Sequence, residues 1–211
     1  MTTIYLIRHG QASFGAESYD KLSPNGELQA KLLGQYFNKI LKEEPYVVAG
    51  SMQRHQQTAN LALAECFPEA SIVTDHAWNE FNHQQVFAQY EPRFNEPHLL
   101  KADVENETNP RAYLAKIFEG AIERWTGGDY HHEYDESWPH FKTRVEDTLQ
   151  NLCNELAQTK PRYAVVFTSG GVISVAVGKL LGLSPEKTFA LNWAIDNASI
   201  TTLRLVGNEP Q

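Results

Sequence analysis

Short apolar runs alternate along this chain with longer segments whose apolar residues recur at helical spacing. Five β-branched or apolar runs predict strands, at residues 3–8, 46–49, 71–74, 163–168 and 199–206. Helical spacing predicts five longer helices, at residues 24–40, 54–66, 110–125, 138–156 and 171–181. Strands that alternate with helices predict an α/β fold, a three-layer αβα sandwich around a mostly parallel sheet.

The first predicted helix has a clear start. Ser23 is typical of an N-cap, and Pro24 suits the first helical position. The apolar residues that follow at helical spacing predict the buried face of the helix: Leu28, Leu32, Leu33, Tyr36, Phe37 and Ile40.

Residues 76–137 differ from the rest of the chain. They contain many aromatic residues and three prolines, and residues 91–136 hold 11 acidic against 5 basic residues, a net charge of −6. We therefore predict one domain over residues 1–211, with a helical and loop insertion at about 76–137.

The composition excludes several classes of function. A net charge of −8 without a basic stripe argues against nucleic-acid binding. No apolar run is long enough to cross a bilayer, and the N-terminus lacks a signal-peptide pattern, so we expect a cytoplasmic protein with no membrane contact. Cys66 and Cys153 are predicted to be reduced, buried thiols. His131 and His132 are adjacent and so point apart, and we expect neither a metal site nor a cofactor.

Chemistry-bearing residues follow the C-terminal ends of the predicted strands, where α/β sheets bind ligands. They are Arg8, His9, Arg54, Glu80, Ser169 and Gly170. Each alone is also typical of an ordinary strand end, a solvated helix residue or a surface acid. Their shared placement favours one pocket.

Such a pocket predicts phosphoryl transfer without a metal. Two guanidinium groups from Arg8 and Arg54 can bind a tetrahedral oxyanion, and amides at the start of the helix after Ser169 add donors. His9, as a neutral imidazole, is a competent nucleophile toward phosphorus. The Glu80 carboxyl can deliver a proton to the leaving oxygen.

The segment Ile4-Tyr5-Leu6-Ile7-Arg8-His9-Gly10 resembles the signature strand of the histidine phosphatase superfamily, the phosphoglycerate mutase-like clan. The segment Leu22-Ser23-Pro24-Asn25-Gly26-Glu27-Leu28-Gln29-Ala30 resembles the helix start of that family. The segment Ser51-Met52-Gln53-Arg54-His55-Gln56-Gln57-Thr58-Ala59 resembles the family's arginine motif. The segment Trp78-Asn79-Glu80-Phe81 resembles the motif that contains the family's acidic residue. The C-terminal segments resemble Gly170-Gly171-Val172-Ile173 and Asn197-Ala198-Ser199-Ile200.

This resemblance implies a role for each residue. His9 is the nucleophile that becomes phosphorylated, and Arg8 and Arg54 bind the phosphate. Glu80 is the general acid and then the base for the attacking water. Ser169 and Gly170 are expected to bind phosphate, and residues 76–137 are expected to form a lid.

Two positions depart from the family pattern. The family has a second histidine where this chain has Ser169, and many members have an asparagine where this chain has Gly15. Losing one preorganised donor costs about 10²–10³ in rate, so we expect Ser169→His to raise activity about tenfold or more unless another group compensates. His55 and His83 are the nearest candidates for that group.

Three functions remain open from the sequence. The first is a phosphomonoester hydrolase, of the histidine acid phosphatase type, that forms a phosphohistidine on a phosphorylated small molecule or phosphoprotein. The alternative is a weak or inactive member that binds a phosphorylated ligand or partner. A mutase-type transferase is the third.

Overall fold

The computed structural model describes residues 1–13 and 20–211, which form two compact units. The first unit contains Met1–Glu80 and Arg144–Gln211, and the second contains Phe81–Thr143. Gly15 lies outside the described residues.

A six-stranded sheet forms the centre of the first unit, in the order β3-β2-β4-β1-β5-β6. The strands are β1 (Thr2–Arg8), β2 (Tyr46–Ala49), β3 (Ile72–Thr74), β4 (Tyr163–Thr168), β5 (Ile200–Val206) and β6 (Glu209–Pro210). The first four run parallel, and β5 and β6 are antiparallel to their neighbours. The predicted α/β class and mostly parallel sheet are confirmed, and β6 was not predicted.

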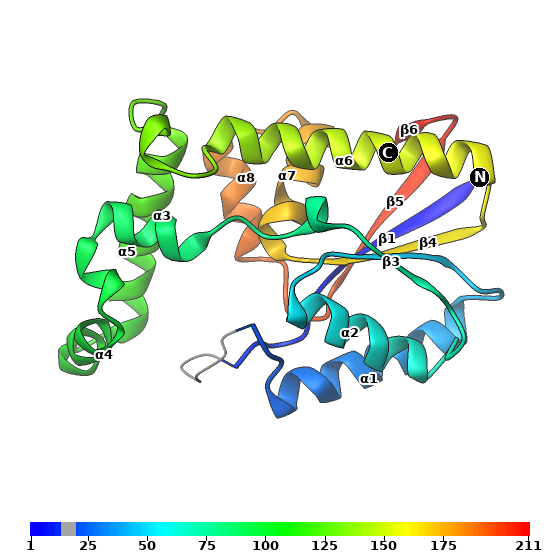
Figure 1. The fold of residues 1–211 in the computed structure, drawn as a ribbon, viewed down its shortest axis with the longest axis horizontal. Coiled ribbons are helices and arrows are strands. Elements are labelled where there is room, and N and C mark those ends of the chain that lie inside the picture. The colour runs from blue at the N-terminus through cyan, green and yellow to red at the C-terminus, as the bar shows by residue number, and fades with distance from the viewer. Residues whose placement is uncertain (14–19) are drawn as a thin grey trace. The chain divides into compact units, whose positions relative to one another are not determined.

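Helices cover both faces of this sheet (Figure 1). α1 (Pro24–Ile40) and α2 (Gln53–Ala64) lie on one face. The other face carries α7 (Gly170–Leu181) and the part of α6 (Trp138–Thr159) that belongs to this unit. The short α8 (Pro185–Asn192), which the sequence analysis missed, packs against α7.

The register of the parallel strands brings their C-terminal ends together. Arg8 of β1 pairs with Thr168 of β4, and the neighbouring Phe167 pairs with Ala49 of β2. Ala49 in turn pairs with Thr74 of β3. The residues that follow these four ends therefore meet at one edge of the sheet, as predicted.

Alternate strand residues pack beneath α1 and α2. The buried cluster there takes odd-numbered positions from three strands, including Ile7, Val47 and Val165. This spacing of two places every second side chain on one face. From the helices, Leu33 and Phe37 fill the same core.

The predicted apolar face of α1 is only partly right. Ser23 caps the helix, since its hydroxyl accepts from the Gly26 amide at 3.1 Å. Leu28, Leu32 and Tyr36, however, are each about half exposed. The small residues Gly26, Ala30 and Gly34 are buried instead. α1 lies so close to α2 that a Cβ at Gly34 would be 2.1 Å from the Ala62 carbonyl oxygen.

The second unit is helical, with an aromatic core. It contains α3 (His83–Tyr90), α4 (Pro97–Asn106), α5 (Pro110–Thr126) and the start of α6, with 3₁₀ turns at Pro92–Asn95 and His131–Glu133. The Phe81 ring stacks on Trp125 at 4.6 Å, and both contact Phe141. Loops and short helices were expected here, and the predicted insertion at about 76–137 overlaps this unit of Phe81–Thr143.

Both cysteines are free thiols, but only Cys153 is buried. Burial raises the pKa of Cys153 to about 11, so this thiol stays protonated at neutral pH. Cys66 is only half buried, which corrects the prediction of two buried thiols. Among the described residues, no helix has both the length and the apolar character to cross a membrane.

Candidate active site

The predicted site begins with His9, directly after β1. Its imidazole is nearly buried, and its Nδ1 lies 2.7 Å from the Gly10 carbonyl oxygen. Because a carbonyl only accepts hydrogen bonds, Nδ1 carries the ring proton. Arg54 Nε, which only donates, lies 3.2 Å from His9 Nε2. Both contacts assign the same tautomer, in which Nε2 presents a lone pair.

Side-chain hydrogen bonds also hold the backbone around His9. The Gly10 amide donates to Thr58 Oγ1 at 3.0 Å, and the Thr58 hydroxyl donates to the Arg54 carbonyl oxygen at 2.7 Å. On the other side, Asn197 Nδ2 donates to the His9 carbonyl oxygen at 3.1 Å. These bonds connect His9 to α2 and to the segment before β5.

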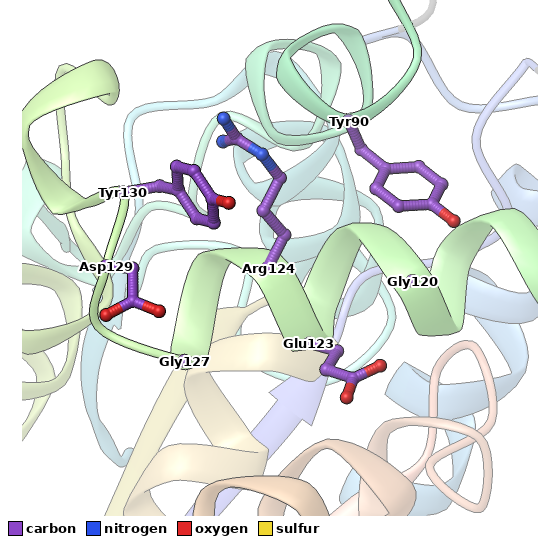
Figure 2. A pocket seen from close by; sticks show the side chains of 7 residues that line it. All are labelled: Tyr90, Gly120, Glu123, Arg124, Gly127, Asp129 and Tyr130. Carbon is purple, nitrogen blue, oxygen red and sulfur yellow. The ribbon is translucent and has the colours of Figure 1, made fainter.

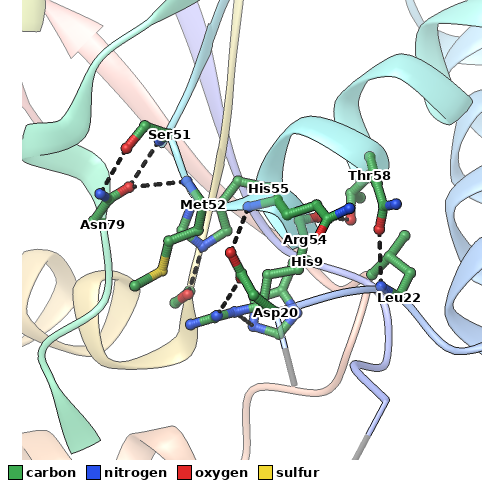
Figure 3. Close-up of polar contacts among 12 residues, drawn as sticks. His9, Asp20, Leu22, Ser51, Met52, Arg54, His55, Thr58 and Asn79 are labelled. Carbon is green, nitrogen blue, oxygen red and sulfur yellow. Dashed lines mark hydrogen bonds and ion pairs between the residues drawn. The ribbon is translucent and has the colours of Figure 1, made fainter. Parts of the chain in front are cut away.

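Arg54 is held by an acidic residue that the sequence analysis did not select. Its buried guanidinium donates through Nη1 to Asp20 Oδ1 at 2.7 Å (Figure 3). The other oxygen of Asp20 accepts from the Gln53 amide at 2.8 Å, at the start of α2. The Asp20 carboxylate therefore binds both a guanidinium and the N-terminus of a helix, and each of these groups could otherwise bind an anion.

Arg8 is the last residue of β1. Its guanidinium donates to the Ile195 carbonyl oxygen. A Cβ at Gly170 would lie 3.4 Å from Arg8 Cζ and 2.2 Å from Asn192 Oδ1. Glycine at 170 thus permits the close approach of Arg8 and Asn192 to the start of α7.

Glu80 also reaches the start of α7. Its Oε2 accepts from the Gly171 amide at 3.0 Å. That amide therefore donates to a carboxylate and is not available to bind phosphate in this arrangement. The segment before Glu80 is fixed by Asn79, whose Oδ1 accepts from the Ser51 amide at 2.8 Å. Thr168 also donates to the Trp78 carbonyl oxygen at 2.5 Å.

Ser169 is buried and hydrogen-bonded to His55. The distance between Ser169 Oγ and His55 Nε2 is 2.6 Å. The His55 ring in turn lies beside His9, with 5.6 Å between the ring centroids. His55, one of the two histidines considered as substitutes at this strand end, therefore contacts Ser169. His83 lies in α3 of the second unit, where its ring contacts Phe87.

Burial is the main reason why His55 is neutral. It lowers the pKa of His55 well below its ordinary value of 6.5, and electrostatic interactions with His9 and Arg54 lower it further. The site therefore gains a neutral imidazole, and not a third cation, at this position.

The described residues contain no group of three or more His, Cys, Asp or Glu side chains that could hold a metal ion. His131 and His132 lie in a 3₁₀ turn of the second unit. The groups assembled at the strand edge are a nucleophilic nitrogen, two guanidiniums, a carboxyl and a hydroxyl. Such a set can bind and transfer a phosphoryl group.

A pocket of about 540 Å³ lies within the second unit (Figure 2). Its lining contains none of the predicted phosphate-binding residues. The Arg124 guanidinium lies 3.9 Å above the Tyr130 ring and forms an ion pair with Glu133 at 2.6 Å. That cation is thus already engaged by its own unit.

Comparison with known proteins identifies the family. Residues 4–211 match the model of the histidine phosphatase superfamily (branch 1), and the chain belongs to that family. A search of curated proteins finds no match.

Solved structures with the same fold include phosphatases and a mutase. A phosphoserine phosphatase variant from Entamoeba histolytica is 17% identical with a TM-score of 0.66, covering 100% of this chain and 94% of that one. The alpha-ribazole phosphatase from Shigella flexneri is 20% identical, with a TM-score of 0.64 and coverages of 99% and 93%. A phosphoglycerate mutase from Bacillus anthracis is 19% identical, with a TM-score of 0.65 and coverages of 96% and 87%.

Neither Asp20 nor a role for Thr58 was predicted from the sequence. Thr58 follows Arg54 by four residues, so both lie on one face of α2, and this spacing was a usable signal. Nothing comparable marks Asp20, which precedes α1 in a turn and reaches Arg54 only through the tertiary fold.

We expect Asp20→Asn to tighten the binding of inorganic phosphate about fivefold. The change removes a carboxylate that competes for Arg54, and a partly exposed ion pair is worth up to about 1 kcal/mol. Isothermal titration calorimetry measures the affinity. Asp147→Asn, an exposed residue of α6, makes the same change in net charge and serves as the control. If Asp20→Asn weakened phosphate binding while Asp147→Asn did not, Asp20 would position Arg54 instead of competing with phosphate for it.

Acid should destabilise the protein through His55. Its pKa is lower in the folded than in the unfolded chain, so the unfolded chain binds the proton first as the pH falls through 6.5. We expect the wild type to lose up to about 1.4 kcal/mol per pH unit more than His55→Gln below pH 6.5. Urea unfolding at several pH values measures this loss. His140→Gln, an exposed control, should follow the wild type, and parallel curves for all three proteins would contradict the prediction.

Proposed function

We propose that the protein is a phosphomonoester hydrolase that transfers the phosphoryl group to His9 Nε2 and then to water. The observation that carries this proposal is the fixed tautomer of His9. Its Nδ1 proton is bound to the Gly10 carbonyl, and its Nε2 lone pair lies at the strand edge beside Arg54.

In the first step, His9 Nε2 attacks phosphorus and the ester P–O bond breaks. The leaving alkoxide takes a proton from the Glu80 carboxyl. Arg54 and Arg8 neutralise the charge on the phosphoryl oxygens, and Arg54 exchanges its contacts with His9 and Asp20 for the phosphate. In the second step, water gives a proton to the Glu80 carboxylate and attacks phosphorus. The N–P bond breaks and inorganic phosphate leaves.

We propose a phosphorylated small molecule or a phosphoprotein as the substrate, with no metal or cofactor. The names of the structural neighbours, which include phosphoserine and alpha-ribazole phosphatases, support a phosphomonoester. A net charge of −8 disfavours nucleic acid.

A second candidate is a family member that binds a phosphorylated ligand with little turnover. Ser169 favours it, because a buried serine beside a neutral imidazole brings no positive charge to the end of β4. The same site would then hold phosphate without releasing it. Mutase-type transfer between substrates is the third and least supported candidate.

Trapping the phosphoenzyme tests the proposal. Wild-type protein mixed with a ³²P-labelled phosphomonoester and quenched in alkaline detergent should carry alkali-stable, acid-labile label on His9. His9→Ala should abolish both label and turnover, because no other group replaces the nucleophile. His140→Gln should behave as wild type, and EDTA should leave the rate unchanged.

Each contrary result has a distinct meaning. Phosphate binding without label or turnover would favour the binding function. A strict Mg²⁺ requirement, or label on another residue, would contradict the mechanism.

A further inference from the structure

His55 is the most deeply buried polar ring at the site, with an exposed fraction of 0%. Its Nε2 contacts Ser169 Oγ at 2.6 Å, while its Nδ1 has no hydrogen-bond partner among the described residues. Nδ1 packs instead on Gly50, where a Cβ would lie only 2.2 Å away. The ring is thus enclosed on one side and directed at a single hydroxyl on the other.

The two possible tautomers of His55 differ in cost. If Nδ1 carried the proton, a buried N–H would be left without an acceptor, and such orphaned donors are rare in proteins. If Nε2 carries the proton, that N–H donates to Ser169 Oγ. Nδ1 is then an acceptor, and leaving this acceptor unpaired costs less than leaving an N–H unpaired. The packing therefore favours the tautomer with the proton on Nε2.

This tautomer determines what Ser169 can do. A hydroxyl has one proton and two lone pairs, and here one lone pair accepts from His55. The proton of Ser169 stays available for another acceptor. The surroundings suit an oxyanion, because the His9 ring lies beside His55 and the guanidinium of Arg8 lies beside Gly170. In the opposite arrangement, Ser169 would face a phosphate with lone pairs only and repel it.

We propose that His55 and Ser169 act as one donor relay, in which His55 is a positioning residue that directs the Ser169 hydroxyl proton to a phosphoryl oxygen on His9. This inference rests on the proposed function, since it concerns the oxyanion that His9 attacks. The relay supplies a neutral donor at the end of β4.

The same geometry revises the expectation for Ser169→His. With His55 Nε2 at 2.6 Å from Ser169 Oγ, an imidazole at position 169 that takes the rotamer of the serine would overlap the ring of His55. We therefore expect Ser169→His to lower activity rather than to raise it.

A double-mutant cycle tests whether the two residues act together. We expect Ser169→Ala to slow hydrolysis of p-nitrophenyl phosphate by about 10²–10³, the usual effect of losing one such donor. His55→Phe should slow it at least about tenfold when Ser169 is present, and should cost nothing more in the Ser169→Ala background. Equal costs of His55→Phe in both backgrounds would overturn the proposal.

A conservative variant separates positioning from packing. The amide of His55→Gln places an N–H donor near the position of Nε2, so this variant should recover most of the rate that His55→Phe loses. It should also keep the wild-type pH profile, because His55 acts without titrating. A rate for His55→Gln no better than that of His55→Phe would contradict the relay. His140→Gln again serves as the exposed control.

Two measurements keep the inference testable without turnover. Long-range ¹H–¹⁵N NMR of the wild-type protein should show His55 neutral and protonated on Nε2 at pH 7, and an Nδ1–H tautomer or an imidazolium would overturn the proposal. The affinity of the same variants for inorganic phosphate should follow the same non-additive pattern. A wild type without turnover that passes both tests would contradict the proposed function and leave the relay standing.

Discussion

The hydrogen bond from His9 Nδ1 to the Gly10 carbonyl governs the chemistry of the whole site, because it sets which nitrogen faces the substrate. It depends on the path of the backbone at Gly10. A Cβ at this position would lie 2.4 Å from the carbonyl oxygen of Gly26, and a Cβ at Gly26 would lie 2.1 Å from that of Gln11. The end of β1 and the start of α1 therefore pack backbone against backbone. Only glycine at both positions permits this contact without displacement.

The charges around His9 Nε2 are balanced or avoided when no phosphate is bound. Arg54 is buried, and Asp20 balances its charge. His55, although only 5.6 Å from His9 between ring centroids, is kept neutral chiefly by burial. Another buried cation beside Arg54 would be costly when no anion is bound, and the neutral state of His55 avoids it. When a phosphate binds, the arginines supply positive charge, and neutral donors such as the Ser169 hydroxyl orient the phosphate through hydrogen bonds.

Local patterns made most of the fold predictable. β-branched runs identified β1 and β4, and the C-terminal ends of the strands led to Arg8, His9 and Ser169 because parallel strands in register end at one edge. The exposed face of α1 was not predictable in this way. Leu28 and Leu32 share the helical spacing of the buried residues, and only the close approach to α2 selects the small residues instead.

Contacts between segments distant in the chain could not be predicted from the sequence. Asp20 meets Arg54, and His55 meets Ser169 across 114 positions of the chain. Ser169 was recognised as a departure from the family pattern, and His55 was one of two candidates to compensate for it. The hydrogen bond between them, which supports His55 in that role, depends on how α2 packs beside β4.

The proposed chemistry of this site depends on His9 Nε2 as the point of phosphoryl attachment. The most direct measurement is ³¹P–¹⁵N correlation NMR on the trapped phosphoenzyme, with ¹⁵N-labelled histidine. We expect a covalent P–N bond to Nε2 of His9, with Nδ1 still protonated. A phosphoryl group on Nδ1, or on any histidine other than His9, would contradict it.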